Sequence, residues 1–356
     1  MGLFPIRRPT VGIDISARAL TLVEVSREWR KAGRGWRLRQ CTRQEVSEGV
    51  LNPSATEPNI ANLTIMTSHL RGLLKDHMGS CVAVSLPDQC ARLALFDFET
   101  LPHKATEVEA LLRFRFQKDL GIPLGDARIT YRVFRPKSDA NRTVRVLVAA
   151  VRQEIVGQYE QLCEQVGVVP VAVGLSSFLL FDACTAAMTT SARDALFLHV
   201  GEQSLAFLAF QQGCPIFLRV KSLPHHVLQM PDGQVGDGGA ENTGSAKEAP
   251  IIQEILATLH YYADRYLGQP DEGGPRPCPL YLVKAYGDYR NGRQDTNGED
   301  DPLGPAAGEV LSAALTDQVQ LKLMMLDWNV LRVSNGSTRG PLARSGLSAI
   351  AAMLAA

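Results

Sequence analysis

Histidine and cysteine side chains could bind a metal ion, but their spacing in this sequence does not favour one. His225 and His226 form an adjacent pair. Neighbouring side chains on an extended segment point to opposite sides, and no spaced third ligand follows. The seven cysteines, at positions 41, 81, 90, 163, 184, 214 and 278, include no CxxC pair. We therefore interpret the histidines as a solvated pair and the cysteines as reduced core thiols of a cytoplasmic protein.

Motifs for hydrolytic chemistry are also missing. The sequence contains no GxSxG, no GxxxxGK followed by Ser or Thr, and no HExxH, so it indicates neither a nucleophilic serine, a P-loop nor a helical zinc site. Glu154, Glu164 and Glu254 fall in expected helices. We interpret them as solvated, or for Glu254 as a charge that favours a helix N-terminus. The sequence therefore shows no catalytic centre.

Basic and aromatic residues alternate in one expected helix, a pattern that can signal nucleic-acid binding. Arg113, Arg115 and Lys118 enclose Phe114 and Phe116. Residues two apart lie on different helix faces, and the whole chain carries 37 basic and 37 acidic residues. Because phosphate neutralisation normally needs a basic excess, we expect no nucleic-acid partner and interpret this helix as packing and contacting a protein.

Length and hydropathy predict a folded chain in two large parts. The sequence has 356 residues, 45% of them hydrophobic, which suits two cores and excludes general disorder. Asp14 interrupts the N-terminal region before an apolar stretch long enough for a signal peptide. The longest nearly uncharged stretch, 166–181, is shorter than the ~20 residues of a spanning helix. We expect a cytoplasmic protein with no membrane span of its own.

The first half alternates strand and helix patterns. Period-two alternation predicts a hairpin of strands at 11–15 and 19–25, and a third strand at 35–40 after a basic linker. The pattern then predicts a helix over 59–77, a strand over 81–86 and a β-α-β-β unit. That unit comprises a strand at 91–100, a helix at 106–120 capped by Thr106 with Glu109, and strands at 128–134 and 143–151. A helix at 152–165, a buried strand at 168–174 and a helix at 176–188 follow.

The second half repeats the hairpin pattern. Strands are expected at 195–201, 204–210 and 216–220, and an amphipathic helix at 251–267. The polar, glycine-rich stretches 231–250 and 288–308 are expected to be disordered loops. Further elements are expected as a strand at 279–287, a helix at 309–315, a strand at 319–325 and a terminal helix at 343–356.

Several segments together resemble the PilM family of type IV pilus assembly proteins, which are actin-like and related to FtsA. GIDISARALTLVEV resembles that family's opening, VAVSLP its strand before the insert, and residues 99–134 its insert helix, "IP" turn and following strand. VVPVAVGLSSFLLFDAC, the hairpin after residue 195, PIIQEILATLHYY and SGLSAIAAMLAA resemble later family segments in the same order. The resemblance covers about the whole chain.

The resemblance implies an α/β, actin-like (ribonuclease H-like) fold of two lobes. Residues 1–87 are expected to form the first subdomain, 88–151 a small FtsA-type α+β insert, and 152–190 a helical return to the first lobe. Residues 191–356 are expected to form the second lobe.

The resemblance also implies a nucleotide cleft for ATP and Mg²⁺, which this sequence retains in degraded form. Asp14 occupies the position of the first acidic residue, but Ser16 replaces a glycine and Thr21 a lysine. In the second turn Gly201 is kept, whereas His199 replaces an acid; of a later Gly-Gly element only Gly287 remains. These changes crowd the phosphates and weaken a hard-metal site. We expect that ATP and Mg²⁺ are not bound and that no nucleotide is hydrolysed, and Asp14 is either a phosphate or metal contact or a turn residue.

Family resemblance further implies that a groove between the first subdomain and the insert receives the cytoplasmic N-terminal peptide of PilN, a single-pass membrane protein. Apolar residues that could line it are Leu93, Leu95, Phe96, Leu112 and Phe116, although the same residues could form the insert's core.

The expected function is a scaffold at the inner membrane that links a PilN-like protein to the pilus motor ATPase or platform protein. An active actin-like ATPase is one alternative. The other is a GspL-like type II secretion subunit, which should continue into a membrane span.

Overall fold

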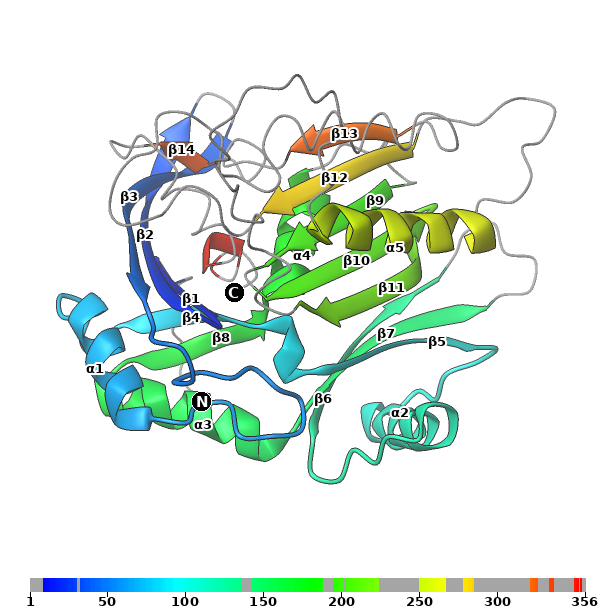
Figure 1. The fold of residues 1–356 in the computed structure, drawn as a ribbon, viewed down its shortest axis with the longest axis horizontal. Helices are drawn as coiled ribbons and strands as arrows, with labels where there is room; N and C mark the ends of the chain where they lie inside the picture. Colours follow the sequence, from blue (N-terminus) through cyan, green and yellow to red (C-terminus); the bar gives the residue numbers. More distant parts are fainter. Residues whose placement is uncertain are drawn as a thin grey trace, which may run out of the picture.

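The computed structural model describes residues 9–30, 33–135, 143–187, 195–201, 203–223, 250–266, 278–284, 321–325, 333–335, 349–351 and 353. Predictions for His225, His226, Gly287, the 288–308 loop and the 309–315 helix lie outside these residues, as does nearly all of 231–250. The described strands form three sheets, of six, five and three strands (Figure 1).

The first sheet begins with the predicted hairpin. Its strands are β1 (Val11–Ser16), β2 (Ala19–Arg30), β3 (Gly33–Glu45), β4 (Cys81–Leu86), β8 (Val169–Leu175) and β14 (Val333–Asn335), in the order β14-β3-β2-β1-β4-β8. β4 and β8 join parallel to β1. Helices α1 (Leu63–Leu73) and α3 (Gln153–Val166) pack against one face through a core that includes Ile13, Val84 and Leu162. Nearly all residues of β1 and β4 are buried, so both faces of these central strands are covered.

Two predictions in this sheet need correction. The basic linker after residue 29 is largely strand, because β2 and β3 pair continuously out to Arg30 and Gly33. The first helix begins at Leu63 rather than Asn59. Asn62 caps it by accepting from the backbone N–H of Ile65, whereas the buried Asn59 side chain accepts from the N–H of Ser54 in the preceding loop. Because the side chain of Asn59 binds the backbone of the preceding loop, Asn59 belongs to that loop and the helix starts after it.

The insert has the predicted β-α-β-β order. It comprises β5 (Arg92–Phe98), α2 (Ala105–Leu120), β6 (Arg128–Phe134) and β7 (Val144–Val151), with the sheet order β5-β7-β6. The predicted capping box at Thr106 is wrong. Lys104 occupies the N-cap without a side-chain hydrogen bond, and Glu109 pairs instead with Arg113 one turn later. Helix α2 ends at Leu120, as predicted, and Gly121 follows it in the left-handed conformation that glycine adopts without strain.

The second lobe repeats the strand order of the first. Strands β9 (Ala195–Val200), β10 (Ser204–Gln211) and β11 (Cys214–Ser222) form an antiparallel meander, and β12 (Cys278–Lys284) and β13 (Leu321–Met325) add in parallel to β9. The order β11-β10-β9-β12-β13 is that of β3-β2-β1-β4-β8. Helices α4 (Ser176–Ala187) and α5 (Pro250–Tyr266) agree with the predicted helices.

The end of the chain returns to the first lobe, which corrects the prediction that all of 191–356 belongs to the second. Strand β14 pairs with β3, and Ala349, Ile350, Ala351 and Met353 pack in a core shared by both lobes. In Figure 1 this segment, in red, lies between the two sheets. A Cβ on Gly12 would come within 2.4 Å of the Ala349 carbonyl oxygen, so glycine lets this segment approach β1 directly.

The described cysteines largely fit the prediction of reduced core thiols. Cys41, Cys90, Cys163 and Cys214 are buried, and Cys81 is exposed. Burial raises the pKa of Cys90 to about 12 and that of Cys163 to about 11, so both thiols stay protonated and unreactive at neutral pH.

Candidate functional site

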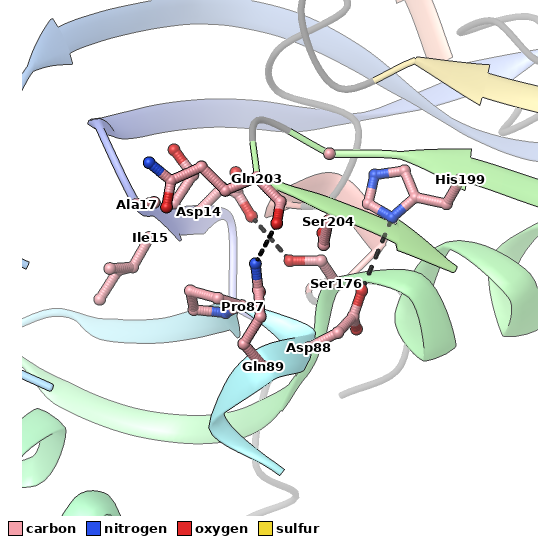
Figure 2. A pocket seen from close by; sticks show the side chains of 12 residues that line it. Asp14, Ile15, Ala17, Pro87, Asp88, Gln89, Ser176, His199, Gln203 and Ser204 are labelled. Carbon is pink, nitrogen blue, oxygen red and sulfur yellow. Dashed lines mark hydrogen bonds and ion pairs between the residues drawn. The ribbon is translucent and has the colours of Figure 1, made fainter. Parts of the chain in front are cut away.

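A small polar cavity lies where the hairpin turns of the two lobes meet. Its walls come from the β1–β2 turn, the segment after β4, the start of α4 and the β9–β10 turn. The lining residues are Asp14, Ile15, Ser16, Ala17, Pro87, Asp88, Gln89, Ser176, His199, Gly201, Gln203 and Ser204 (Figure 2). Polar side chains from both lobes therefore converge here, at the carboxyl ends of parallel strands, where α/β proteins commonly bind ligands.

Asp14 is tied to the first lobe. Its side chain is buried, and Ser176 Oγ lies 3.3 Å from Asp14 Oδ1. The Ser176 hydroxyl also contacts the Ser85 hydroxyl at 2.8 Å and the Leu86 carbonyl at 3.0 Å. Ser16 donates to the Ala19 carbonyl and closes the β1–β2 turn. The first hairpin turn is thus held by its own side chains.

The second turn brings Gly201 to the cavity. The Gly201 N–H donates to the Ser204 carbonyl at 2.8 Å, and a Cβ at Gly201 would lie 2.6 Å from Ser204 Oγ. Glycine is therefore required for the two arms of this turn to approach each other. Gln89 Nε2 donates to the Gln203 carbonyl and links the segment after β4 to the same turn.

A buried chain of polar groups joins the lobes beside the cavity. The carboxylate of Asp88, in the short 3₁₀ helix η1 (Asp88–Cys90), accepts from the backbone N–H of Ser177 at 3.1 Å and from its hydroxyl at 2.5 Å. Ser177 Oγ lies 2.7 Å from His199 Nδ1. An ionised carboxylate only accepts, so Ser177 donates to Asp88 and His199 Nδ1–H donates to Ser177. Through this chain the first lobe holds His199, the residue found where the resemblance led us to expect an acid in the second turn.

Bound Mg-ATP does not fit the described residues in this conformation. The cavity has a volume of about 30 Å³, whereas pockets for drug-sized ligands enclose ~300 Å³ or more. His199 Nδ1 is engaged by Ser177 while its Nε2 is buried without a partner among the described residues, and this part of the chain holds no cluster of three His, Cys, Asp or Glu residues suited to a metal ion. Among the described walls, Gln89 reaches the Gln203 carbonyl and Ser177 reaches His199, so side chains of the two lobes bridge this part of the cleft.

The structure gathers only part of the predicted nucleotide site. Asp14, Ser16 and Gly201 line the cavity, while Thr21 pairs with Asp14 across the hairpin and is buried without lining it. The sequence interpretation missed Asp88, Ser176 and Ser177. Their sequence signal is their place directly after two buried parallel strands, at the edge where such strands end together.

The predicted peptide-lining residues divide between two sides of the insert sheet. Phe96, Leu112 and Phe116 are buried between β5 and α2, so for these three the groove assignment is wrong and the core alternative holds. Leu93 and Leu95 are half-buried on the opposite side of β5, where Leu93 packs against the first-lobe core. Side chains alternate along β5, so one strand cannot direct all three of its predicted residues into the same groove.

The basic side of α2 is occupied by packing, as the sequence predicted. Arg115 stacks on the rings of Phe96 and Phe98, each at 5.1 Å from the ring centroid. Arg113 binds Glu109 and the carbonyls of Gly125 and Ala127. Phe114 is exposed beside Lys118.

An exposed apolar edge occurs instead on β8, which the sequence predicted to be buried. Val169, Val171 and Val173 are 54%, 37% and 52% exposed, and they alternate with half-buried residues. β8 is the last strand of the first sheet, and Pro170 lacks the N–H that an interior strand would need. We call Val169, Val171 and Val173 the β8 edge.

The insert's edge strand β6 contacts the two helices that precede and follow β8 in the chain. Arg128 contacts Gln153 at 2.7 Å and Glu160 at 3.3 Å on α3, which precedes β8. Arg132 pairs with Asp182 on α4, which follows β8. The insert and the β8 edge thus belong to one connected region of the first lobe.

Two sheets with the same strand order, a cleft at their hairpin turns and a small α+β insert in the first lobe define an actin-like protein. A family model for the type IV pilus assembly protein PilM matches residues 12–229. The chain belongs to the PilM family of type IV pilus assembly proteins. The match spans the first lobe, the insert and the second hairpin.

Three solved structures are similar to this chain to different degrees. A PilM-PilN type IV pilus biogenesis complex is 18% identical, covers 98% of both chains and has a TM-score of 0.67. A Bacteroides thetaiotaomicron protein with an actin-like ATPase fold is 10% identical over 91% of this chain and 94% of that one, with a TM-score of 0.46. The cytoplasmic domain of Vibrio cholerae EpsL, an inner membrane component of the type II secretion system, is 10% identical over 86% and 94%, with a TM-score of 0.41.

A search of curated proteins gave no match. Among the described residues, no helix combines the length and apolar character needed to cross a membrane.

Proposed function

We propose that this chain is a scaffold of the type IV pilus assembly complex that binds the cytoplasmic N-terminal peptide of a PilN-like membrane protein and connects it to a motor or platform protein. The observation that carries this proposal is the exposed β8 edge, which lies within the residues matched by the PilM family. The solved complex of a PilM with a PilN supports the choice of partner. The chain would then sit at the inner face of the membrane through that partner.

The β8 edge is suited to an extended peptide. An added strand would pair with the backbone of β8, while alternate side chains contact the exposed valines. Exposed valines on an edge strand otherwise invite aggregation, which natural proteins normally prevent. Because the connected insert strand β6 is itself a sheet edge, the peptide would also contact this side of the insert.

A double substitution Val171→Asp and Val173→Asp is expected to weaken binding of a synthetic PilN-like N-terminal peptide by about a hundredfold or more in titration calorimetry. Burial of each valine contributes about 1.5 kcal/mol or more, and a carboxylate against an apolar strand adds a desolvation cost. The matched control is Phe114→Asp, which places the same charge on the exposed face of α2.

Three outcomes would count against this proposal. Failure of the unaltered protein to bind the peptide at millimolar concentration removes its main support. Equal binding by the double variant would show that the peptide binds elsewhere than on β8. A dimer in gel filtration that the double variant dissociates would show that a second copy, not a peptide, covers the edge.

We also propose that the cleft acts structurally and does not hydrolyse ATP. The polar chain through Asp88, Ser177 and His199, together with the small cavity, supports this role. Addition of Mg-ATP is expected to leave the melting temperature of the purified protein unchanged, since a ligand that does not bind cannot stabilise. A concentration-dependent rise that Asp14→Ala abolishes would favour the alternative of an actin-like ATPase.

A further inference from the structure

A strongly basic segment lies in the first sheet although the chain as a whole is neutral. Residues 27–43 contain seven basic residues and one acidic residue, against 37 of each in the whole sequence. The segment spans the end of β2 and most of β3. Its charge is therefore concentrated on one hairpin and is hidden in the overall balance.

The hairpin of β2 and β3 extends beyond the end of β1, the strand that pairs with the first part of β2. β1 pairs with β2 only over 19–24. Beyond that, residues 25–30 of β2 pair with 33–38 of β3, and β14 borders β3 at 36–38. Six residues of strand span about 20 Å. In Figure 1 β2 and β3, in blue, curve away from β1 toward β14. We call residues 25–39 the basic ribbon.

The basic ribbon has one packed and one charged side. Leu38 is buried and Trp36 half-buried in the core between the lobes, whereas the alternating residues Arg37 and Arg39 are exposed. Arg27 is exposed as well, but it pairs with Trp36 across the two strands and lies over the Trp36 ring, 5.8 Å from its centroid, on the side opposite Arg37 and Arg39. Within the described part of the chain, neither Arg37 nor Arg39 has an acidic partner. Several other described arginines of the first lobe and the insert, among them Arg113, Arg115 and Arg132, are ion-paired.

We propose that the basic ribbon binds the surface of an anionic lipid bilayer through its headgroup phosphates. Guanidinium groups bind phosphates in bidentate pairs, and a short basic surface is attracted to an anionic leaflet. A nucleic acid fits less well, because the charge occupies one short ribbon of a neutral protein and does not follow a groove along which a phosphate backbone could run.

The proposal rests on the proposed function, which places the chain beside a bilayer through a single-pass partner. It adds a second contact that orients the protein on that bilayer. The two contacts lie on strands at different places in the first sheet, since β3 is next to β14 at one end and β8 is the strand at the other. Peptide and lipid could therefore be bound at the same time.

The test is sedimentation of the full chain with two kinds of vesicle, phosphatidylcholine alone and phosphatidylcholine mixed with phosphatidylglycerol. Binding is expected only to the mixed vesicles and is expected to fall as salt rises, because surface charges are screened. The double variant Arg37→Gln, Arg39→Gln should bind about 25-fold more weakly, since each basic residue near such a surface contributes about fivefold. The control Arg92→Gln, Lys118→Gln removes the same charge from exposed positions of the insert and should bind as the unaltered protein does.

Equal vesicle binding by the ribbon variant and the control, binding to phosphatidylcholine alone, or no binding at low salt would each overturn the proposal. So would a tighter, ribbon-dependent association with double-stranded DNA in fluorescence anisotropy. Peptide titration in solution without lipid separates this proposal from the proposed function. The ribbon variant should bind the PilN-like peptide normally, so either contact can fail without the other.

Discussion

Replacing Asp88 by alanine is expected to lower the free energy of unfolding by about 3–5 kcal/mol in a guanidinium titration. Asp88 is 1% exposed and accepts from both the backbone N–H and the hydroxyl of Ser177. Its removal leaves these donors buried and unsatisfied, and it ends the chain that holds His199 of the second lobe. Loss of one partner from a buried polar network costs the desolvation of every group left behind.

The matched control is Asp126→Ala, which removes an exposed acid from the insert and should change stability by less than about 0.5 kcal/mol. A double-mutant cycle with His199→Gln measures how strongly the two lobes are coupled through this chain. If Asp88→Ala costs no more than the control, Asp88 does not join the lobes, and the structural role proposed for the cleft is wrong.

Replacing Leu112 by alanine is expected to cost about 2–5 kcal/mol of unfolding free energy. Leu112 is 0% exposed and shares a core with Phe116 and Phe96, whose rings meet edge to face at 5.3 Å. A cavity in a small α+β unit cannot be filled without moving its only helix, so most of the lost packing stays lost. Chemical denaturation followed by circular dichroism measures this change.

Phe114→Ala serves as the control, because Phe114 is 56% exposed on the same helix and should cost less than about 0.5 kcal/mol. Peptide affinity separates the core role of Leu112 from the groove role that the sequence suggested. The folded Leu112→Ala protein should bind the PilN-like peptide as tightly as the unaltered chain. Weaker peptide binding with an unchanged free energy of unfolding would show that Leu112 lines the peptide site.

Sequence patterns predicted the elements well where one periodic face was buried. The hairpin at β1 and β2, strand β4, helix α3 with its glycine end at Gly167, and the meander from β9 to β11 all lie where expected. Their signals are local, because alternation, amphipathic period and turn residues act within a few positions. The ordered resemblance to the PilM family then gave the topology, which the matched family and fold confirm.

Predictions failed where a residue's role depends on distant segments. Val169, Val171 and Val173 look like a core strand, but their exposure follows from β8 being the last strand of its sheet. Nothing in the local sequence states whether a further strand will cover such an edge. Likewise, the alternation in β5 indicates a strand but does not say which side faces α2.

The sequence alone indicated the class of this protein and its two hairpin turns, and the resemblance to the PilM family implied a cleft in which Ser16, Thr21 and His199 stand for a glycine, a lysine and an acid. Tertiary structure decided the surroundings of the cleft residues. Asp88, Ser177 and His199 are separated by 89 and 22 residues, and only the folding of two sheets against each other brings them into hydrogen-bonding distance. The same holds for the basic ribbon, where Arg37 and Arg39 share one exposed side because they alternate with Trp36 and Leu38 on a strand that pairs with β2 beyond the end of β1. Local propensity selects elements, whereas the surroundings of a side chain depend on contacts between elements far apart in the chain.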